Sequence, residues 1–304
     1  MGSNNDNVDK GIGADPETKD DERTWIVIAC FLAVALYNTV ELTFIIFTTF
    51  KRRWGLYFWS FLVATWGIAP YAAGFILKFL ARSDESILIV VLISVGWCCM
   101  VTGQSLVLYS RLHLLLWSPT RLRFVLCMII LDAFICHVPT IVLATGANIA
   151  GGGSSGEPFV RGYSVYEKVQ VTIFFAQELV ISGLYIYETV VLFRSGGSSA
   201  TRRILAHLIY VNVIVIALDV AILALEYASL YYLQVTFKAF AYSVKLKLEF
   251  SILNRLVDLV LAPKKSSMNL STRGDSAVRC PQVEFVTMGT GARTVTSENP
   301  IQGP

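Results

Sequence analysis

The sequence predicts an all-α membrane protein, a bundle of seven transmembrane helices with its N-terminus outside the membrane and its C-terminus in the cytosol. The 304 residues are 55% hydrophobic and only 15% charged, and their mean hydropathy of +0.59 is too high for an ordinary water-soluble domain. The apolar residues form blocks of about twenty, the length that a helix needs to cross ~30 Å of hydrocarbon. The lipid bilayer is therefore the expected environment, and a net charge of +3 gives no reason to expect nucleic acid as a partner.

A polar segment, residues 1–24, precedes the first apolar block. It carries seven acidic and three basic residues and almost no large apolar side chains, so we expect it to be disordered. It also lacks the short apolar core and the cleavage site of a secretory signal. The first span must therefore direct its own insertion, and the helical domain is expected to cover residues 25–261.

Seven spans follow, separated by polar connections. The basic loop KRRWG follows the first span, ARSDES the second, a segment with three arginines the third, a long Gly-rich segment the fourth and RSGGSSATRR the fifth. The last apolar block holds about forty residues, too many for one crossing, and EYASLYY offers a turn between two crossings. The expected spans are residues 25–50, 57–79, 87–109, 124–145, 169–193, 204–225 and 228–248.

The orientation follows from the basic residues near the ends of the spans, which concentrate on the cytosolic side of membrane proteins. Three connections carry three bases each: KRRWG, RSGGSSATRR and the segment with Arg111, Arg121 and Arg123. The alternate connections are poorer, since ARSDES also holds acids and the long Gly-rich connection holds only Arg161 and Lys168. The base-rich connections are therefore expected in the cytosol, where a signalling partner could contact them.

The stretch KLKLEFSILNRLVDLVL after span seven predicts an amphipathic helix lying on the inner leaflet. Its apolar side chains recur on one helical face, namely Leu246, Phe250, Leu253, Val257 and Val260. Residues 262–304 are rich in Ser, Thr and Gly, and we expect them to form a disordered cytosolic tail.

Ionisable side chains at membrane depth are rare and often mark functional sites. The stretch YYLQVTFKAFAYSVKLKLEF places Lys238 near the centre of span seven, where an ammonium group costs ~2.5 kcal/mol or more. Counting from each span's midpoint, Glu41 and Asp132 lie about one turn nearer the cytosol. Glu178 and Asp219 lie about one turn nearer the outside. One of these four carboxylates is expected to neutralise Lys238, with Asp219 or Glu178 favoured and Glu41 or Asp132 as alternatives.

Polar residues recur at helical spacing in three spans and predict stripes that face one another inside the bundle. Facing lipid would leave every one of them without a partner. The stripes are Tyr231, Gln234, Lys238, Tyr242, Lys245 and Glu249 in span seven, Glu178, Ser182, Tyr185 and Thr189 in span five, and Asn212, Asp219 and Glu226 in span six. The candidate residues of a ligand cavity are Lys238, Gln234, Asp219, Glu178, Gln104, Asp132 and Glu41. The Lys238 ion pair has three interpretations: a structural contact between helices, a ligand or ion site, or part of a proton relay.

The sequence carries no catalytic motif of the HExxH, GxSxG or phosphate-loop type, and GGGSSG lies in a connection between spans. Five of the six cysteines fall inside apolar blocks and the sixth in the tail, so no disulfide between external loops is expected. The adjacent Cys98 and Cys99 lack a histidine or a second cysteine pair at ligand spacing. We therefore expect no catalytic residue, metal or cofactor.

Three stretches, TFKRRWGLYFWSFLVATWGIAPY, GQSLVLYSRLHLL and YSVKLKLEFSILNRLV, resemble a family of uncharacterised multi-pass membrane proteins of filamentous fungi. The resemblance covers residues 25–260 and implies a seven-span membrane fold and a fungal source. That family has no established activity, so the resemblance implies no functional residue.

The topology is also similar to that of heptahelical receptors, although Ser110 stands where their switch motif carries an acid, and NPxxY is absent from span seven. Lys238 lies at the depth of the chromophore lysine of retinal proteins, but span three holds no carboxylate counter-ion. Gln234 also stands where the ion-pumping microbial kind has an acid one turn before the lysine. The likeness to both groups is therefore architectural, and retinal is not expected as a cofactor.

Three functions fit these observations. The first is a receptor-like sensor of a small or lipophilic ligand, held in a cavity among spans three, five, six and seven. The second is a secondary transporter or proton-coupled carrier, because four buried carboxylates exceed one lysine, although no internal repeat is found. The third is a membrane-embedded enzyme, a lipid or terpene cyclase with Asp132, Glu178 or Asp219 as proton donor. The expected location is the plasma membrane or an endomembrane.

Overall fold

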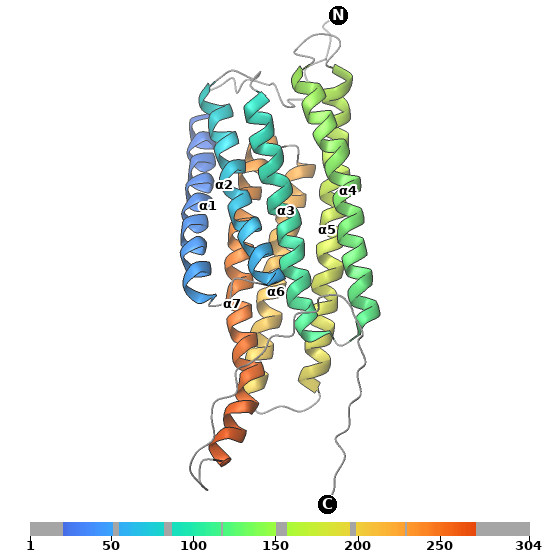
Figure 1. Ribbon diagram of the computed structural model, residues 1–304. Coiled ribbons are helices and arrows are strands. Elements are labelled where there is room, and N and C mark those ends of the chain that lie inside the picture. Colours follow the sequence, from blue (N-terminus) through green and yellow to red (C-terminus); the bar gives the residue numbers. More distant parts are fainter. Residues whose placement is uncertain are drawn as a thin grey trace, which may run out of the picture. The chain divides into compact units, whose positions relative to one another are not determined.

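The structure, a computed structural model, describes residues 21–50, 55–81, 87–116, 118–149, 157–194, 199–228 and 230–271. Within these residues it consists of α-helices and contains no strand, which confirms the all-α prediction (Figure 1). In chain order the helices are α1 (Asp21–Thr49), α2 (Leu56–Ala81), α3 (Ile87–Leu115), α4 (Pro119–Ile149), α5 (Glu157–Arg194), α6 (Ser199–Tyr227) and α7 (Tyr231–Ser271). Residues 1–20 and 272–304, which hold most of the predicted disordered ends, lie outside the described residues.

Six of these helices, α1 to α6, are long and apolar enough to cross a membrane. They make the chain a multi-pass membrane protein, as its composition predicts. Helix α7 is not among the six, because Lys238, Lys245 and Lys247 fall within one membrane-length stretch of it. The seventh span therefore remains a prediction, and so do the orientation and the choice of membrane.

The helix boundaries agree with the predicted spans within about five residues at most ends, with three larger differences. Helix α3 ends at Leu115, six residues after the predicted span. Helix α5 begins at Glu157, twelve residues before the predicted span, and Pro158 suits its first turn because a proline there loses no helical hydrogen bond. Helix α7 continues to Ser271, through the separate amphipathic helix predicted at residues 245–261 and the first ten residues of the tail predicted as disordered. No glycine or proline interrupts residues 231–262, so nothing in the local sequence stops α7 after the predicted span.

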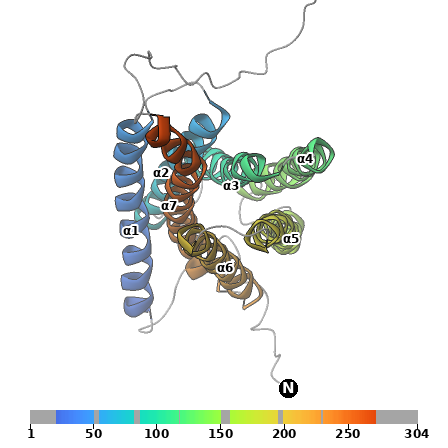
Figure 2. The ribbon, with the colours of Figure 1, turned by 90° about the horizontal axis from the view of Figure 1, so that it is seen from below.

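Residues 1–261 form one compact unit, and α7 lies between its other helices (Figure 2). The Asn38 side chain of α1 donates a hydrogen bond of 2.9 Å to Ser243 of α7. The Tyr71 hydroxyl of α2 donates one of 3.1 Å to the Val235 carbonyl of α7. Helix α4 packs against α3 and α5. Residues 262–304 form a second unit, of which the structure describes the last residues of α7.

Helices α2 and α3 approach each other so closely that glycine is required at their contact. A Cβ atom added at Gly96 would lie 2.4 Å from the Tyr71 nitrogen, and one added at Gly67 would lie 2.6 Å from the Met100 nitrogen. Small residues of this kind allow membrane helices to pack backbone against backbone. Tyr71 and Trp97, which stand beside these glycines, are therefore held by two closely packed helices.

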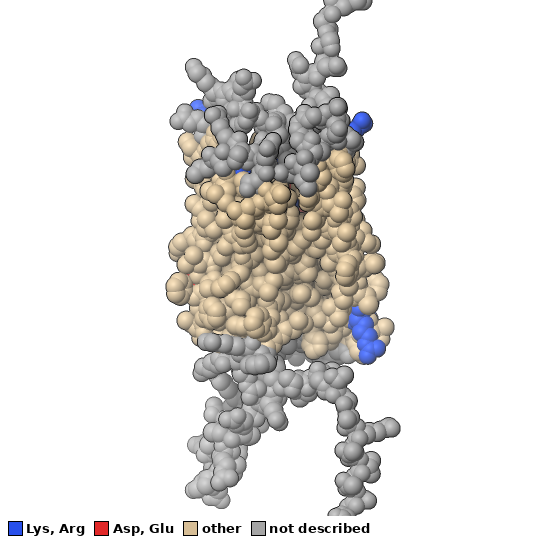
Figure 3. Space-filling view, turned by 45° about the horizontal axis from the view of Figure 1, so that its top comes forward, with Lys and Arg blue, Asp and Glu red and all other residues tan. Residues whose placement is uncertain are grey.

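The outer surface of the described helices suits a lipid environment. Figure 3 shows a face whose middle carries no charged side chain, with lysine and arginine only near its two ends. Exposed side chains on the helices include large aromatic residues such as Phe44, Phe124 and Phe134. A charge-free apolar band between charged ends is the surface that hydrocarbon requires.

Candidate functional site

The polar stripes predicted on three helices are buried and face one another, as expected. Fully buried side chains include Gln234 and Glu249 on α7, Ser182 and Tyr185 on α5, and Asn212 on α6. Hydrogen bonds join α7 to both other helices. The helical spacing of the stripes therefore identified the interior faces of α5, α6 and α7.

An inner triad, defined as Glu178, Asp219 and Lys245, ties these three helices together. The Lys245 ammonium donates a hydrogen bond of 2.8 Å to Glu178 Oε2 and a second one to Asp219 Oδ1. The Tyr242 hydroxyl donates to the other oxygen of Glu178 at 3.3 Å. Lys245 is 0%, Glu178 2% and Asp219 8% exposed, so the whole triad is removed from the surface.

An outer triad, defined as Glu167, Glu226 and Lys238, lies nearer the turn between α6 and α7. Lys238 Nζ is 3.7 Å from Glu167 Oε1, an ion pair that is longer than a hydrogen bond. Glu226 is buried and lies close enough to interact electrostatically with Glu167. Its Oε2 atom has no hydrogen-bond partner in the described part of the chain. Each triad thus takes one residue from α5, one from α6 and one from α7.

The sequence spacing explains why the two triads repeat. Lys238 and Lys245 are seven residues apart on α7, and Glu226 and Asp219 are seven apart on α6. Two helical turns separate residues at this spacing, which places them on nearly the same face and roughly 10 Å apart along the axis. Glu167 precedes Glu178 by three turns on α5. The bundle therefore stacks two similar groups of charges along its length.

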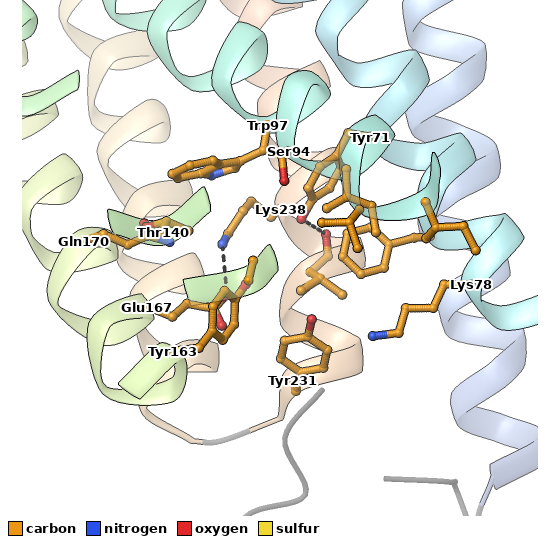
Figure 4. A pocket seen from close by; sticks show the side chains of 16 residues that line it. Tyr71, Lys78, Ser94, Trp97, Thr140, Tyr163, Glu167, Gln170, Tyr231 and Lys238 are labelled. Atoms are coloured by element: carbon orange, nitrogen blue, oxygen red, sulfur yellow. Dashed lines mark hydrogen bonds and ion pairs between the residues drawn. The ribbon is translucent and has the colours of Figure 1, made fainter. Parts of the chain in front are cut away.

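A cavity of about 80 Å³ opens beside the outer triad, and it is called the outer cavity below (Figure 4). Side chains of α2, α3, α4, α5 and α7 form its wall. Figure 4 shows Lys238, Glu167 and Tyr163 together on one side and Lys78 on another, with Tyr231 between them. Aromatic and aliphatic groups complete the lining, among them Phe75, Trp97, Ile93 and Val235.

A smaller cavity of about 30 Å³ joins the neighbourhood of Lys238 to the inner triad, and it is called the inner cavity. Glu178, Asp219 and Tyr242 contribute to its wall. Trp97, Gln170 and Lys238 line both cavities and therefore stand between them. A volume of 30 Å³ accommodates about two water molecules.

Arg111 forms a third polar contact further along the bundle. Its guanidinium donates hydrogen bonds of 2.6 Å to Glu249 and 2.8 Å to Asn212, and lies 4.0 Å from the ring centre of Tyr185. Arg111 is only 1% exposed. The prediction that it belongs to a basic loop is wrong, because α3 continues to Leu115 and keeps this residue inside the bundle.

The predicted partner of Lys238 is also wrong. Asp219 and Glu178 both bind Lys245, two positions further along the same stripe of α7, and Lys238 pairs with Glu167. Glu167 belongs to the segment expected as an external connection, and the early start of α5 brings it into the bundle. Lys238 is nonetheless buried and charge-paired, as expected.

The remaining candidate residues lie in different places. Gln234 and Gln104 are buried, and neither amide group has a hydrogen-bond partner among the residues that the structure describes. Glu41 is half-buried and accepts a hydrogen bond of 2.6 Å from Lys247, apart from both triads. Asp132 is half-buried on α4 and forms no ion pair with any described side chain. The structure therefore does not bring Glu41 or Asp132 into the polar interior.

Two functional candidates that the sequence analysis missed carry a signal in their spacing. Glu167 extends the α5 stripe toward the start of the helix, since residues 167, 170, 174 and 178 follow one another at intervals of three or four residues. Arg111 continues an α3 series of Trp97 and Gln104 at intervals of seven. Glu167 and Arg111 both lie beyond the apolar blocks, so the hydrophobic pattern assigned them to the connections between spans.

Comparison with known families gives one match. The family model described as "Domain of unknown function (DUF7703)" matches residues 21–269, which include α1 to α6 and nearly all of α7. No curated protein and no solved structure matches the chain.

Proposed function

The chain belongs to the DUF7703 family, and we propose that it is a receptor-like sensor that binds a small ligand in the outer cavity. The observation that carries the proposal is the Lys238 and Glu167 pair in the wall of that cavity. At 3.7 Å the two groups do not satisfy each other with a hydrogen bond, so both keep hydrogen-bonding capacity toward a ligand. A cavity with apolar walls and a few convergent polar groups is the usual form of a small-molecule site.

We further propose that α7 is a seventh span. Its lysines would oppose insertion if they faced lipid, but Lys238 and Lys245 are buried in the bundle and each pairs with a carboxylate. Lys247 is half-buried, pairs with Glu41 and lies nearer the end of a membrane-length stretch, where a long side chain reaches the interface. With seven spans, epitope tags on the two ends of the chain should be accessible from opposite sides of a sealed membrane.

The proposed orientation places the N-terminus outside and the basic helix ends in the cytosol. Arg121 and Arg123 at the start of α4 are exposed, and so are Arg202 and Arg203 at the start of α6. These residues support the cytosolic assignment through the usual bias of basic residues. They also form a basic surface for a cytosolic signalling partner, which is part of the proposal. A fungal source and a plasma-membrane or endomembrane location belong to it too.

A sensor needs a route from its ligand to the rest of the protein, and α7 supplies one. A ligand that binds Lys238 competes with Glu167 and changes the contacts between α5 and α7. The same α7 carries Lys245 of the inner triad and Glu249, the partner of Arg111. Ligand binding would then favour the arrangement of α7 in which the ligand makes the stronger contacts.

Thermal unfolding of the purified protein in lipid nanodiscs tests the site. A panel of small amines, carboxylates and zwitterions is screened for compounds that raise the unfolding temperature of the wild type. A compound that binds the outer cavity should lose its effect in Lys238→Met and keep it in Lys247→Met, a matched lysine of the same helix. Equal shifts in all three proteins would place the binding site elsewhere.

A proton-coupled carrier is the second candidate, because the two cavities and the two triads follow one another along the bundle and share the wall of Trp97, Gln170 and Lys238. Liposomes that contain the protein and a pH-sensitive dye test this function. A carrier should acidify the lumen under an imposed gradient, and Asp219→Asn should abolish the signal.

The enzyme hypothesis has less support, since Glu178 and Asp219 both bind Lys245 and Asp132 is outside the interior.

A further inference from the structure

The inner triad contains more negative than positive charge. Two carboxylates, Glu178 and Asp219, contact one ammonium group, that of Lys245. All three side chains are more than nine-tenths buried, and an uncompensated charge in such surroundings is strongly unfavourable. The other buried cations among the described side chains are Lys238 and Arg111, and each has a carboxylate partner of its own.

The geometry allows a proton to remove this excess. One oxygen of Glu178 and one of Asp219 bind the same Lys245 nitrogen, so the two carboxyl groups are neighbours. A proton added to one carboxylate makes a carboxylic acid that can donate a hydrogen bond to the other. The triad then holds one carboxylate, one carboxylic acid and one ammonium, and its net charge is zero.

We propose that the inner triad is a proton-binding site, in which Glu178 and Asp219 share one exchangeable proton through the inner cavity. The proton comes from water and returns to it, so the step is a protonation without any redox or group transfer. The triad can bind this proton with or without a ligand in the outer cavity.

The inner cavity gives the proton a way in and out. Glu178 and Asp219 line it directly, and its volume of about 30 Å³ has room for water. Lys238 closes it toward the outer cavity together with Trp97 and Gln170. Movement of the Lys238 ammonium toward or away from Glu167 would therefore control the exchange.

Charged and titratable groups on five helices surround the shared proton. On α6, Glu226 is buried two turns from Asp219. Lys238, Tyr242 and Glu249 flank Lys245 on α7, and Glu167 stands three turns from Glu178 on α5. Tyr71 of α2 belongs to the same buried cluster as Tyr242, and Arg111 of α3 binds Glu249. Among the described side chains, only Lys245 and Tyr242 donate hydrogen bonds to the two acids. Of these two donors only Lys245 is charged, so together they cannot neutralise two carboxylates.

Infrared difference spectroscopy of the full chain in nanodiscs, between alkaline and neutral buffer, tests the proposal. The wild type should show the C=O stretch of a protonated carboxyl group at neutral pH, shifted in D₂O. Glu178→Gln and Asp219→Asn should each remove this band, since either change leaves a single carboxylate for Lys245. Glu41→Gln and Asp132→Asn, which change acids outside the triad, should leave it in place.

The unfolding temperature of each sample shows whether the variants are folded. Glu178→Gln and Asp219→Asn are isosteric, and each leaves one ion pair with Lys245. If one variant fails to fold, the other still tests the proposal. A wild type without the band, or a band that persists in both folded variants, would overturn the proposal. Loss of the band in both folded variants, with the two control variants unchanged, would support it.

Discussion

The outer and inner triads use the same three helices and the same kinds of side chain, yet they are held differently. In the inner triad the ammonium of Lys245 hydrogen-bonds both acids, and Tyr242 adds a third contact. In the outer triad Lys238 lies 3.7 Å from Glu167 and borders a cavity. Charge composition alone therefore does not decide whether a buried ionic cluster holds helices together or remains open to a ligand. The packing around the cluster decides it.

The two triads should respond differently to loss of their cation, and Lys245→Met is expected to give the largest effect. It leaves Glu178 and Asp219 buried without a counter-charge, and breaking a buried pair in this way costs ~3 kcal/mol or more. Reversible unfolding in detergent or nanodiscs measures the loss. A loss as small as that of a surface lysine would mean that the inner triad contributes little to stability.

Lys238→Met should cost less, about 1 kcal/mol, because the outer pair is long and water in the cavity can solvate Glu167. The double variant with Glu167→Gln removes both charges and should lose less than the sum of the two single variants. The same unfolding assay applies. If Lys238→Met proves as damaging as Lys245→Met, the distinction between an open and a closed triad fails.

Removing one acid of the inner triad should be milder than removing its lysine. Glu178→Gln leaves Lys245 paired with Asp219 and is expected to change the unfolding free energy by less than ~1 kcal/mol. The difference in unfolding free energy between this variant and Lys245→Met shows how far the second carboxylate is in excess of the single lysine. Equal losses would indicate that both acids are ionised and that neither can be spared.

The smallest effect is expected from Lys247→Met. The pair of Lys247 and Glu41 is short at 2.6 Å, but both side chains are about one-third exposed. Exposed pairs contribute ~0 to 1 kcal/mol because solvent screens them. The unfolding free energy of this variant, measured in the same assay as Lys245→Met, shows how much a lysine outside both triads contributes. A large loss here would mean that the contact of α1 with α7 is a main support of the bundle.

The sequence determined the helices and their interior faces. Apolar blocks of membrane length located six spans, and polar residues at helical spacing identified the buried stripes of α5, α6 and α7. These properties are local, since they depend on which side chains a single helix presents to each of its sides. For the same reason the burial of Lys238 was predictable from its place in a stripe.

The pairing of charges was decided only by the tertiary structure. Glu178 and Asp219 bind Lys245 and not Lys238, because the relative heights of α5, α6 and α7 match acids to the lysine two turns further along. Glu167 and Arg111 joined the interior because α5 starts early and α3 ends late, beyond the apolar blocks. The axial offset of one helix against another depends on contacts between distant parts of the chain. An ion pair needs that offset to within about an ångström, and the periodicity of a single helix does not contain it.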